Sequence, residues 1–162
     1  MPELKPIKGA RALLFERLID LDPSAPTELR PFSTLSPSEL RASVRRELAR
    51  LLDTRRYVAA RAVDTTAKLT VVDYGIPDIS DLMPRSGADR QLMASVIRHA
   101  VQAFEPRLSQ IQVTVDAKDE DPRVVAVRIE GHLRYGSVVE AVSFPVSLRV
   151  KQMESESHGA GT

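Results

Sequence analysis

The chain has 162 residues, enough for a single domain with a substantial core, and its formal net charge is +1. It contains no cysteine, which excludes structural disulfides, thiolate metal sites and cysteine nucleophiles. Aromatic residues make up only 4% and tryptophan is absent, so no stacking platform for single-stranded nucleic acid is expected.

The N-terminal third predicts two helices separated by a loop. Leucines at helical spacing predict a short helix over Ala12–Leu21, and the proline-rich segment 22–36 is typical of an extended loop. Ser36 then begins a capping box with Glu39, which predicts a second helix that continues to about Arg56. The apolar stripe of this helix consists of Leu40, Val44, Leu48 and Leu51.

Arginine outnumbers lysine by 18 to 5, and many of the arginines belong to the second helix. They are Arg41, Arg45, Arg46, Arg50, Arg55 and Arg56. Glu47 and Asp53 only partly balance their charge. Such a face is usually solvated surface; the alternative is a face that meets an acidic partner or phosphates.

The middle of the chain is less regular. Residues 57–66 match no pattern well, whereas Leu69–Val72 predicts a short strand. Residues 73–78 then predict a turn, because Gly75 can take positive φ and Pro77 holds the residue before it extended. We expect this connection to fold back over the core, with four side chains packed inward: Tyr74, Ile76, Ile79 and Leu82.

The C-terminal half predicts one long helix followed by three strands. Ser86 caps the helix, which runs to Phe104 and stops before Pro106, so Glu105 is its last residue or already outside it. Alternating apolar residues predict antiparallel strands near 108–115, 125–134 and 142–150. Pro145 cannot donate to a ladder, which predicts an edge strand for the third.

These elements predict an α+β fold, with N-terminal helices packed on one face of a C-terminal antiparallel β-meander of three to four strands. One domain is expected over residues 1–152, followed by a disordered polar tail at 153–162. Residues 1–10 hold no apolar run of a signal sequence, and no stretch of about 18 apolar residues occurs, so a cytoplasmic protein is expected.

The sequence offers little for catalysis. His99, His132 and His158 have no carboxylate or histidine at metal-ligand spacing, and neither a phosphate-binding loop nor a nucleophile elbow is present. A glycosidase could be built only by nominating Glu105 as the acid, with Asp78 or Asp81 as its partner. Arg107 counts against this nomination, because a guanidinium favours the ionised carboxylate whereas a general acid must hold its proton. We therefore expect no enzyme, no cofactor and no metal.

Four segments resemble motifs of the TssE family, the lysozyme-like baseplate wedge subunits of bacterial type VI secretion systems. Residues 43–56, SVRRELARLLDTRR, resemble its "S-V-x-R-x-L-x-x-L-L-N-T-R" helix, and residues 72–78, VDYGIPD, resemble its "V-x-Y-G-L-P-D" turn. Residues 104–108 match "F-E-P-R-L" without a change, and residues 13–18 resemble the opening "L-F-E-R-L". Two departures are Asp53, where asparagine is commoner, and a longer stretch between Arg56 and Leu69.

The resemblance implies a non-catalytic structural subunit of the wedge, beside TssF, TssG and TssK. Such a subunit connects the wedge to the first ring of the contractile sheath, built from TssB and TssC, at a baseplate docked on the cytoplasmic side of the inner membrane. It implies no nucleic acid, no small-molecule substrate and no direct membrane insertion. The alternative function is that of a peptidoglycan-cleaving, lysozyme-like glycosidase.

The resemblance also implies which residues form the protein interface. They are Glu105, Pro106, Arg107, Tyr74, Gly75, Pro77, Asp78, Arg45 and Arg46. Glu105 and Arg107 would form charge-assisted hydrogen bonds with a partner, and substitution of either by alanine would break assembly with the fold nearly intact. If the two side chains are buried together, they are a core ion pair and their assignment to the interface fails. At the sheet edge two interpretations stay open: a neighbouring chain adds a strand on the side that Pro145 does not face, or Pro145 protects the edge from unwanted pairing.

Overall fold

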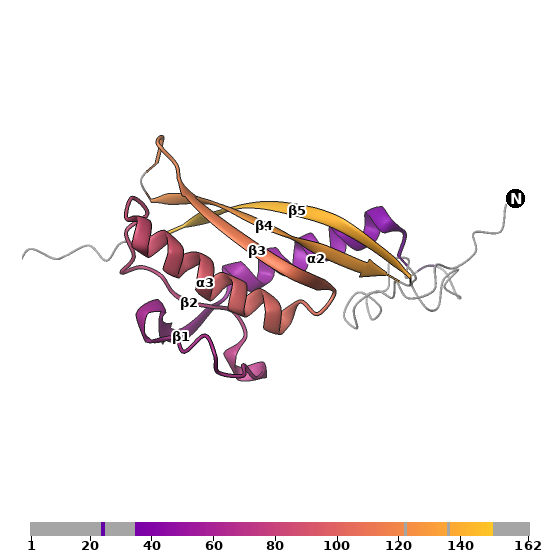
Figure 1. The fold of residues 1–162 in the computed structure, drawn as a ribbon, viewed down its shortest axis with the longest axis horizontal. Helices are drawn as coiled ribbons and strands as arrows, with labels where there is room; N and C mark the ends of the chain where they lie inside the picture. Colours follow the sequence, from indigo (N-terminus) through magenta and orange to yellow (C-terminus); the bar gives the residue numbers. More distant parts are fainter. Residues whose placement is uncertain (1–23, 25–34, 122, 136, 151–162) are drawn as a thin grey trace, which may run out of the picture.

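The computed structural model describes residue 24 and residues 35–150, apart from 122 and 136. The chain forms an α+β fold in which helices precede a three-stranded antiparallel sheet, as predicted (Figure 1). Three predictions lie outside the described residues: the first helix at Ala12–Leu21, the motif at 13–18 and the tail at 153–162. None of the described helices is long and apolar enough to cross a membrane.

Helix α2 spans Pro37–Asp53 and begins at the predicted capping box. The Glu39 carboxylate accepts from the Ser36 backbone N–H at 2.7 Å, while the Ser36 hydroxyl accepts from the Glu39 N–H. The helix ends earlier than predicted, because Thr54 caps it in an extended conformation and donates to the Arg50 carbonyl through both its N–H and its hydroxyl. The residues after Thr54 leave the helix to form a strand.

That strand, β1 at Arg55–Ala59, pairs in parallel with β2 at Ile76–Asp78. The sequence pattern assigns residues 55 and 56 to the helix and leaves residues 57–59 open. The 3₁₀ helix η1, at Ala60–Ala62, follows β1 directly. The strand predicted at Leu69–Val72 is wrong: Val71–Asp73 forms the 3₁₀ helix η2. The physical reason is local, since the Asp73 carboxylate accepts from both the N–H and the hydroxyl of Thr70 and closes the turn.

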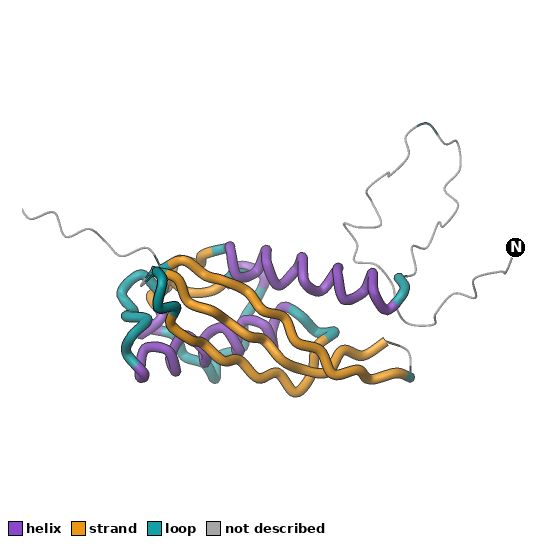
Figure 2. Tube along the Cα trace, turned by 90° about the horizontal axis from the view of Figure 1, so that it is seen from above, coloured by secondary structure: helices purple, strands orange, loops and turns teal. Residues whose placement is uncertain are grey.

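Helix α3 spans Gly87–Phe104, with Ser86 as its cap as predicted. The sheet follows, with β3 at Leu108–Ala117, β4 at Val124–Tyr135 and β5 at Val138–Arg149 in the order β3-β4-β5. Strand β5 therefore lies at an edge, as Pro145 predicted. Figure 2 shows α2 and α3 on the same side of this sheet.

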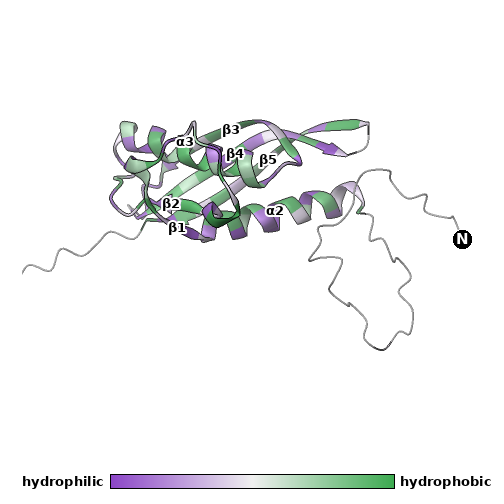
Figure 3. Cartoon of the chain, turned by 90° about the horizontal axis from the view of Figure 1, so that it is seen from below, coloured by the Kyte–Doolittle hydropathy of each residue, from purple (hydrophilic) through white to green (hydrophobic). Residues whose placement is uncertain are grey.

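The core lies between the two helices and the sheet, where their apolar sides face one another (Figure 3). Ile76, Ile79 and Leu82 are buried there and Tyr74 packs against them, as predicted for the connection that folds back. The sheet has one irregularity, a register shift between Ser109 and Gln112 at which Gln110 takes a φ of 52°. The opposite face of the sheet is mostly polar and solvated.

Candidate interaction site

The corner between α3 and β3 is held by backbone hydrogen bonds on both sides. Glu105 caps the end of α3, where its N–H donates to the Val101 carbonyl at 2.9 Å. This is the position at the helix end that the sequence predicted. Its own carbonyl accepts from the Leu108 N–H at 3.1 Å, which closes the turn around Pro106. The Arg107 carbonyl accepts from the Arg134 N–H, so the corner is also attached to β4. Little conformational freedom remains at this position.

The two charged side chains of the corner bind each other. Arg107 donates from Nε to one oxygen of Glu105 at 2.7 Å and from Nη2 to the other, which is the bidentate fork geometry. Its Nη1 donates to the Ser43 hydroxyl of α2 at 2.9 Å. Glu105 is 3% exposed and the Arg107 side chain 15%.

Glu105 and Arg107 are thus a core ion pair in this chain. The prediction that both side chains point outward to a partner is not met here, because Arg107 donates to both carboxylate oxygens of Glu105 and to the Ser43 hydroxyl. Pro106 is exposed at the tip of the same turn. The wider prediction that this region forms an interface stays a prediction.

The structure brings the predicted turn residue Tyr74 to the same corner. Its ring packs edge-on against Phe104, the last residue of α3, with centroids 5.3 Å apart. Burial, with the nearby Glu47 carboxylate adding to it, raises the pKa of Tyr74 above its ordinary value. The Y-G-x-P-D and F-E-P-R-L motifs therefore meet in space.

The other turn residues have different surroundings. Gly75 has a φ of 111°, and a Cβ there would lie 2.6 Å from the Thr54 carbonyl oxygen, so only glycine fits. Pro77 is buried in β2, whereas Asp78 is exposed. The Ser80 N–H donates to Asp78 and holds the pKa of that carboxyl below its ordinary value. Gly75 and Pro77 shape the turn, and of these three residues Asp78 is the accessible one.

Arg45 and Arg46 lie exposed on α2. Along the same helix Arg41 pairs with Glu140 at 3.4 Å, and Arg50 pairs with Glu47. The predicted site residues therefore fall into three groups: the corner, the outer face of α2, and the end of β2.

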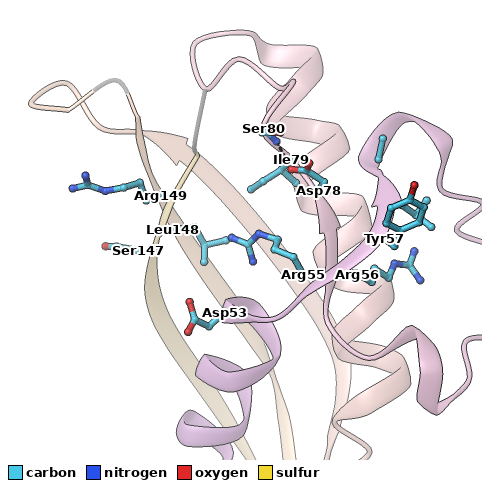
Figure 4. A pocket seen from close by; sticks show the side chains of 12 residues that line it. Asp53, Arg55, Arg56, Tyr57, Asp78, Ile79, Ser80, Ser147, Leu148 and Arg149 are labelled. Atoms are coloured by element: carbon cyan, nitrogen blue, oxygen red, sulfur yellow. Dashed lines mark hydrogen bonds between the residues drawn. The ribbon is translucent and has the colours of Figure 1, made fainter. Parts of the chain in front are cut away.

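Asp78 lies in a groove at the end of β2 (Figure 4). The groove has a volume of about 1090 Å³ and runs between the end of β5 and the β1–β2 pair. Its lining consists of Asp53, Arg55, Arg56, Tyr57, Val58, Ala59, Asp78, Ile79, Ser80, Ser147, Leu148 and Arg149. Most of these residues were not predicted, because the groove depends on the strand β1.

Ser43 is the residue of the corner that the site prediction missed. A signal for it exists, because a hydroxyl at the position one turn after Leu40 faces inward on a stripe that is otherwise apolar. The pairing with Arg107 itself spans 64 positions and has no local signature.

Comparison with known proteins gives a match to a family model. The model is that of the baseplate wedge protein gp25, and it matches residues 38–137. That range contains the corner, the turn and all of α3.

Two solved structures are similar to the chain. One is a chain of "the baseplate complex from the type VI secretion system", with 20% sequence identity, 70% of this chain and 95% of that chain covered, and a TM-score of 0.53. The other is described as a tail lysozyme from Geobacter sulfurreducens, with 20% identity, 71% and 95% coverage and a TM-score of 0.45. Among the curated proteins, none matches the sequence.

Proposed function

The chain belongs to the gp25 baseplate wedge family, and from this premise we propose that it is a non-catalytic structural subunit of a type VI secretion baseplate wedge. In this role it connects the wedge to the first ring of the contractile sheath. The family match carries the proposal, since it spans most of the described residues. The likeness in fold to a chain of a type VI secretion baseplate complex supports it.

The partners that we propose are TssF, TssG and TssK within the wedge, and TssB and TssC in the sheath. The location that follows is the cytoplasmic side of the inner membrane, at the docked baseplate. All four sequence motifs support this choice within the family, and three of them lie among the described residues.

Within this proposal the interface residues divide into two kinds. Glu105 and Arg107 hold the α3–β3 corner from inside, as Gly75 and Pro77 hold the turn. Pro106, Asp78, Arg45 and Arg46 are exposed and accessible to a partner. A corner that is already rigid loses little entropy on binding, which favours assembly.

The lysozyme-like alternative finds no support in the geometry of its nominated acid. Both carboxylate oxygens of Glu105 accept from Arg107, and the residue is buried. A general acid must instead reach the leaving-group oxygen of a bound sugar. We therefore expect no loss of turbidity when purified cell walls are mixed with the protein.

The proposed function is tested by co-purification from cells that express the wedge and sheath subunits together. We expect Arg45→Glu to lower the recovery of a baseplate partner at least severalfold while the melting temperature stays unchanged, because Arg45 is exposed on α2. Arg128→Glu, on the solvated face of β4, is the matched control and should retain its partners. Failure of the wild-type chain to recover any wedge or sheath subunit would overturn the proposal.

A further inference from the structure

The segment from β1 to η2 carries much of the apolar surface that the described residues expose to water. Among these residues seven large apolar side chains are exposed, and four belong to this segment: Tyr57, Val58, Val71 and Val72. Tyr57 is fully exposed, and the two valines of η2 are exposed by 87% and 86%. We call these four residues the β1–η2 face.

The two halves of this face lie next to each other. Arg56 Nη1 of β1 is 3.9 Å from Asp73 Oδ1 of η2. Tyr57 and Val72 are the chain neighbours of this pair. The Asp73 carboxylate also accepts from the N–H and the hydroxyl of Thr70, both at 2.9 Å, which holds the turn that displays the valines. Figure 1 shows β1 and the turns after it at the bottom of the view, apart from the β3–β4–β5 sheet. Clustered apolar side chains of this kind mark a contact surface, whereas scattered ones do not.

Residues 12–21 supply an apolar stripe that lies outside the described residues. The sequence predicts a helix there, with Leu14, Leu18 and Leu21 on one face. An isolated helix shorter than about 12–15 residues is marginal in water. A helix of this length is therefore stable only when its apolar face packs against another surface.

The linker before α2 has the length that docking on the β1–η2 face requires. It consists of residues 22–34 and joins the chain just before α2, whose 17 residues span about 25 Å. Strand β1 begins at the other end of α2, so the linker must bridge a distance of that order. Residues 22–34 span about 20 Å as a flexible coil and about 40 Å as a polyproline II helix. The required span lies between these two lengths, where a tether gives a high effective concentration.

A second exposed apolar pair lies nearer to the linker but is smaller. Val138 and Val139 begin β5, and their neighbour Glu140 pairs with Arg41 in the first turns of α2 at 3.4 Å. The two valines are exposed by only 46% and 55%. Because the hydrophobic driving force grows with the apolar area removed from water, the β1–η2 face gains more from being covered.

We propose that residues 12–21 dock as a helix on the β1–η2 face of the same chain. The leucine stripe lies against Tyr57 and the valines. Glu16 and Asp20, which are one helical turn apart on the side opposite the stripe, stay in water. Docking covers most of the large apolar side chains that the described part of the chain exposes. Both the segment and the face belong to this chain, so the contact does not depend on the proposed function.

The test attaches a nitroxide to the segment in the full chain, labelled with 15N. The chain has no cysteine, so Glu16→Cys provides a single attachment point on the polar side of the predicted helix. A helix is only about 10 Å across, so we expect a docked nitroxide to reduce the amide signals of the β1–η2 face by roughly twofold or more. The signals of Val138 and Val139 should keep their intensity. The reverse pattern, or full intensity at the β1–η2 face, would overturn the proposal.

Two matched pairs of variants test the contact itself. Leu18→Asp, on the stripe, should restore the signals of the β1–η2 face, whereas Ala12→Asp, on the opposite side of the predicted helix, should not. Val72→Asp should also restore them, whereas Val139→Asp places the same charge on another exposed valine and should not. Signals that stay reduced in both Leu18→Asp and Val72→Asp would contradict an apolar contact and overturn the proposal.

A mixed sample distinguishes docking within one chain from docking between two. Spin-labelled chain without 15N is added to an equal amount of the 15N-labelled, cysteine-free chain. We expect the signals of the β1–η2 face to keep their intensity in this mixture. A reduction as large as in the first experiment would show that the segment comes from a second copy and would overturn docking within one chain. A chain that recovers baseplate subunits but shows no reduction in either sample contradicts this inference alone.

Discussion

At the scale of single residues, Glu105 and Arg107 bind each other inside the fold, whereas the sequence motif predicted that they bind a partner. A buried carboxylate and guanidinium that satisfy each other are costly to separate, because the survivor is left charged and without its partner. Arg107 bonds Glu105 through two nitrogens and Ser43 of α2 through a third, so loss of Glu105 also loosens the contact between α3 and α2.

We therefore expect Glu105→Gln to lower the free energy of unfolding by roughly 2–4 kcal/mol, measured by urea denaturation. This differs from the sequence-based expectation that alanine at this position leaves the fold nearly intact. Glu130→Gln, on an exposed position of β4, is the matched control and should change stability by no more than about 0.5 kcal/mol. Equal effects of the two substitutions would show that the pair contributes nothing to the fold.

A second residue-scale prediction concerns acid stability. The Met83 N–H donates to Asp89 at 2.8 Å and Arg61 donates at 2.9 Å, and in this order they hold the pKa of Asp89 below its ordinary value of 3.8. A lowered pKa in the folded state means that the stabilisation is fully present above about pH 4 and is lost as the pH falls through the lowered value.

Asp89→Asn should therefore reduce stability at neutral pH and flatten the loss of stability below pH 4. The measurement is a series of urea titrations between about pH 2 and pH 7. Asp116→Asn, an exposed position on β3, serves as the control, and its stability should fall below pH 4 as that of the wild type does. If the stability of Asp89→Asn also fell below pH 4 as in the wild type, the prediction would be contradicted.

At the scale of elements, the parallel pair β1–β2 depends on one glycine. The Ile76 N–H donates to the Thr54 carbonyl at 3.0 Å, and Gly75 lies against that same carbonyl. Gly75→Ala adds a methyl group 2.6 Å from the oxygen at a φ of 111°, so either the turn or the end of α2 must move.

We expect Gly75→Ala to destabilise the chain by roughly 2–4 kcal/mol in thermal or urea unfolding. Gly87→Ala is the matched control. Gly87 is the first residue of α3, and the nearest atom to an added Cβ is Arg90 Nη2 at 4.0 Å, so the chain should become neither strained nor less stable. If Gly87→Ala destabilised the chain by the same amount, neither the positive φ of Gly75 nor its close approach to the Thr54 carbonyl would explain the loss of stability.

The elements also show what the sequence can predict. The starts of α2 and α3 are predictable, because a serine cap and its acidic partner act within one turn. The meander is predictable from alternation, and the β5 edge from Pro145 alone. Strand β1 is not, because its residues are mostly exposed and carry no alternating pattern, and only pairing with β2 makes it a strand. The groove is missed for the same reason.

At the scale of the whole molecule, the corner and the groove contact different parts of α2. Ser43 contacts the corner pair, whereas Asp53 lines the groove. Ten residues of helix separate them, which corresponds to about 15 Å along the axis. Groups so far apart that share no contact usually contribute independently to stability and to binding.

This separation predicts additivity. The double variant Glu105→Gln with Arg149→Ala should unfold with the stability loss of Glu105→Gln plus that of Arg149→Ala, within about 0.5 kcal/mol. The measurement is urea unfolding of the double variant and of each single variant, with Glu130→Gln in place of Glu105→Gln as the control. A stability loss that departs from the sum by more than this margin would show that the corner and the groove are coupled through α2.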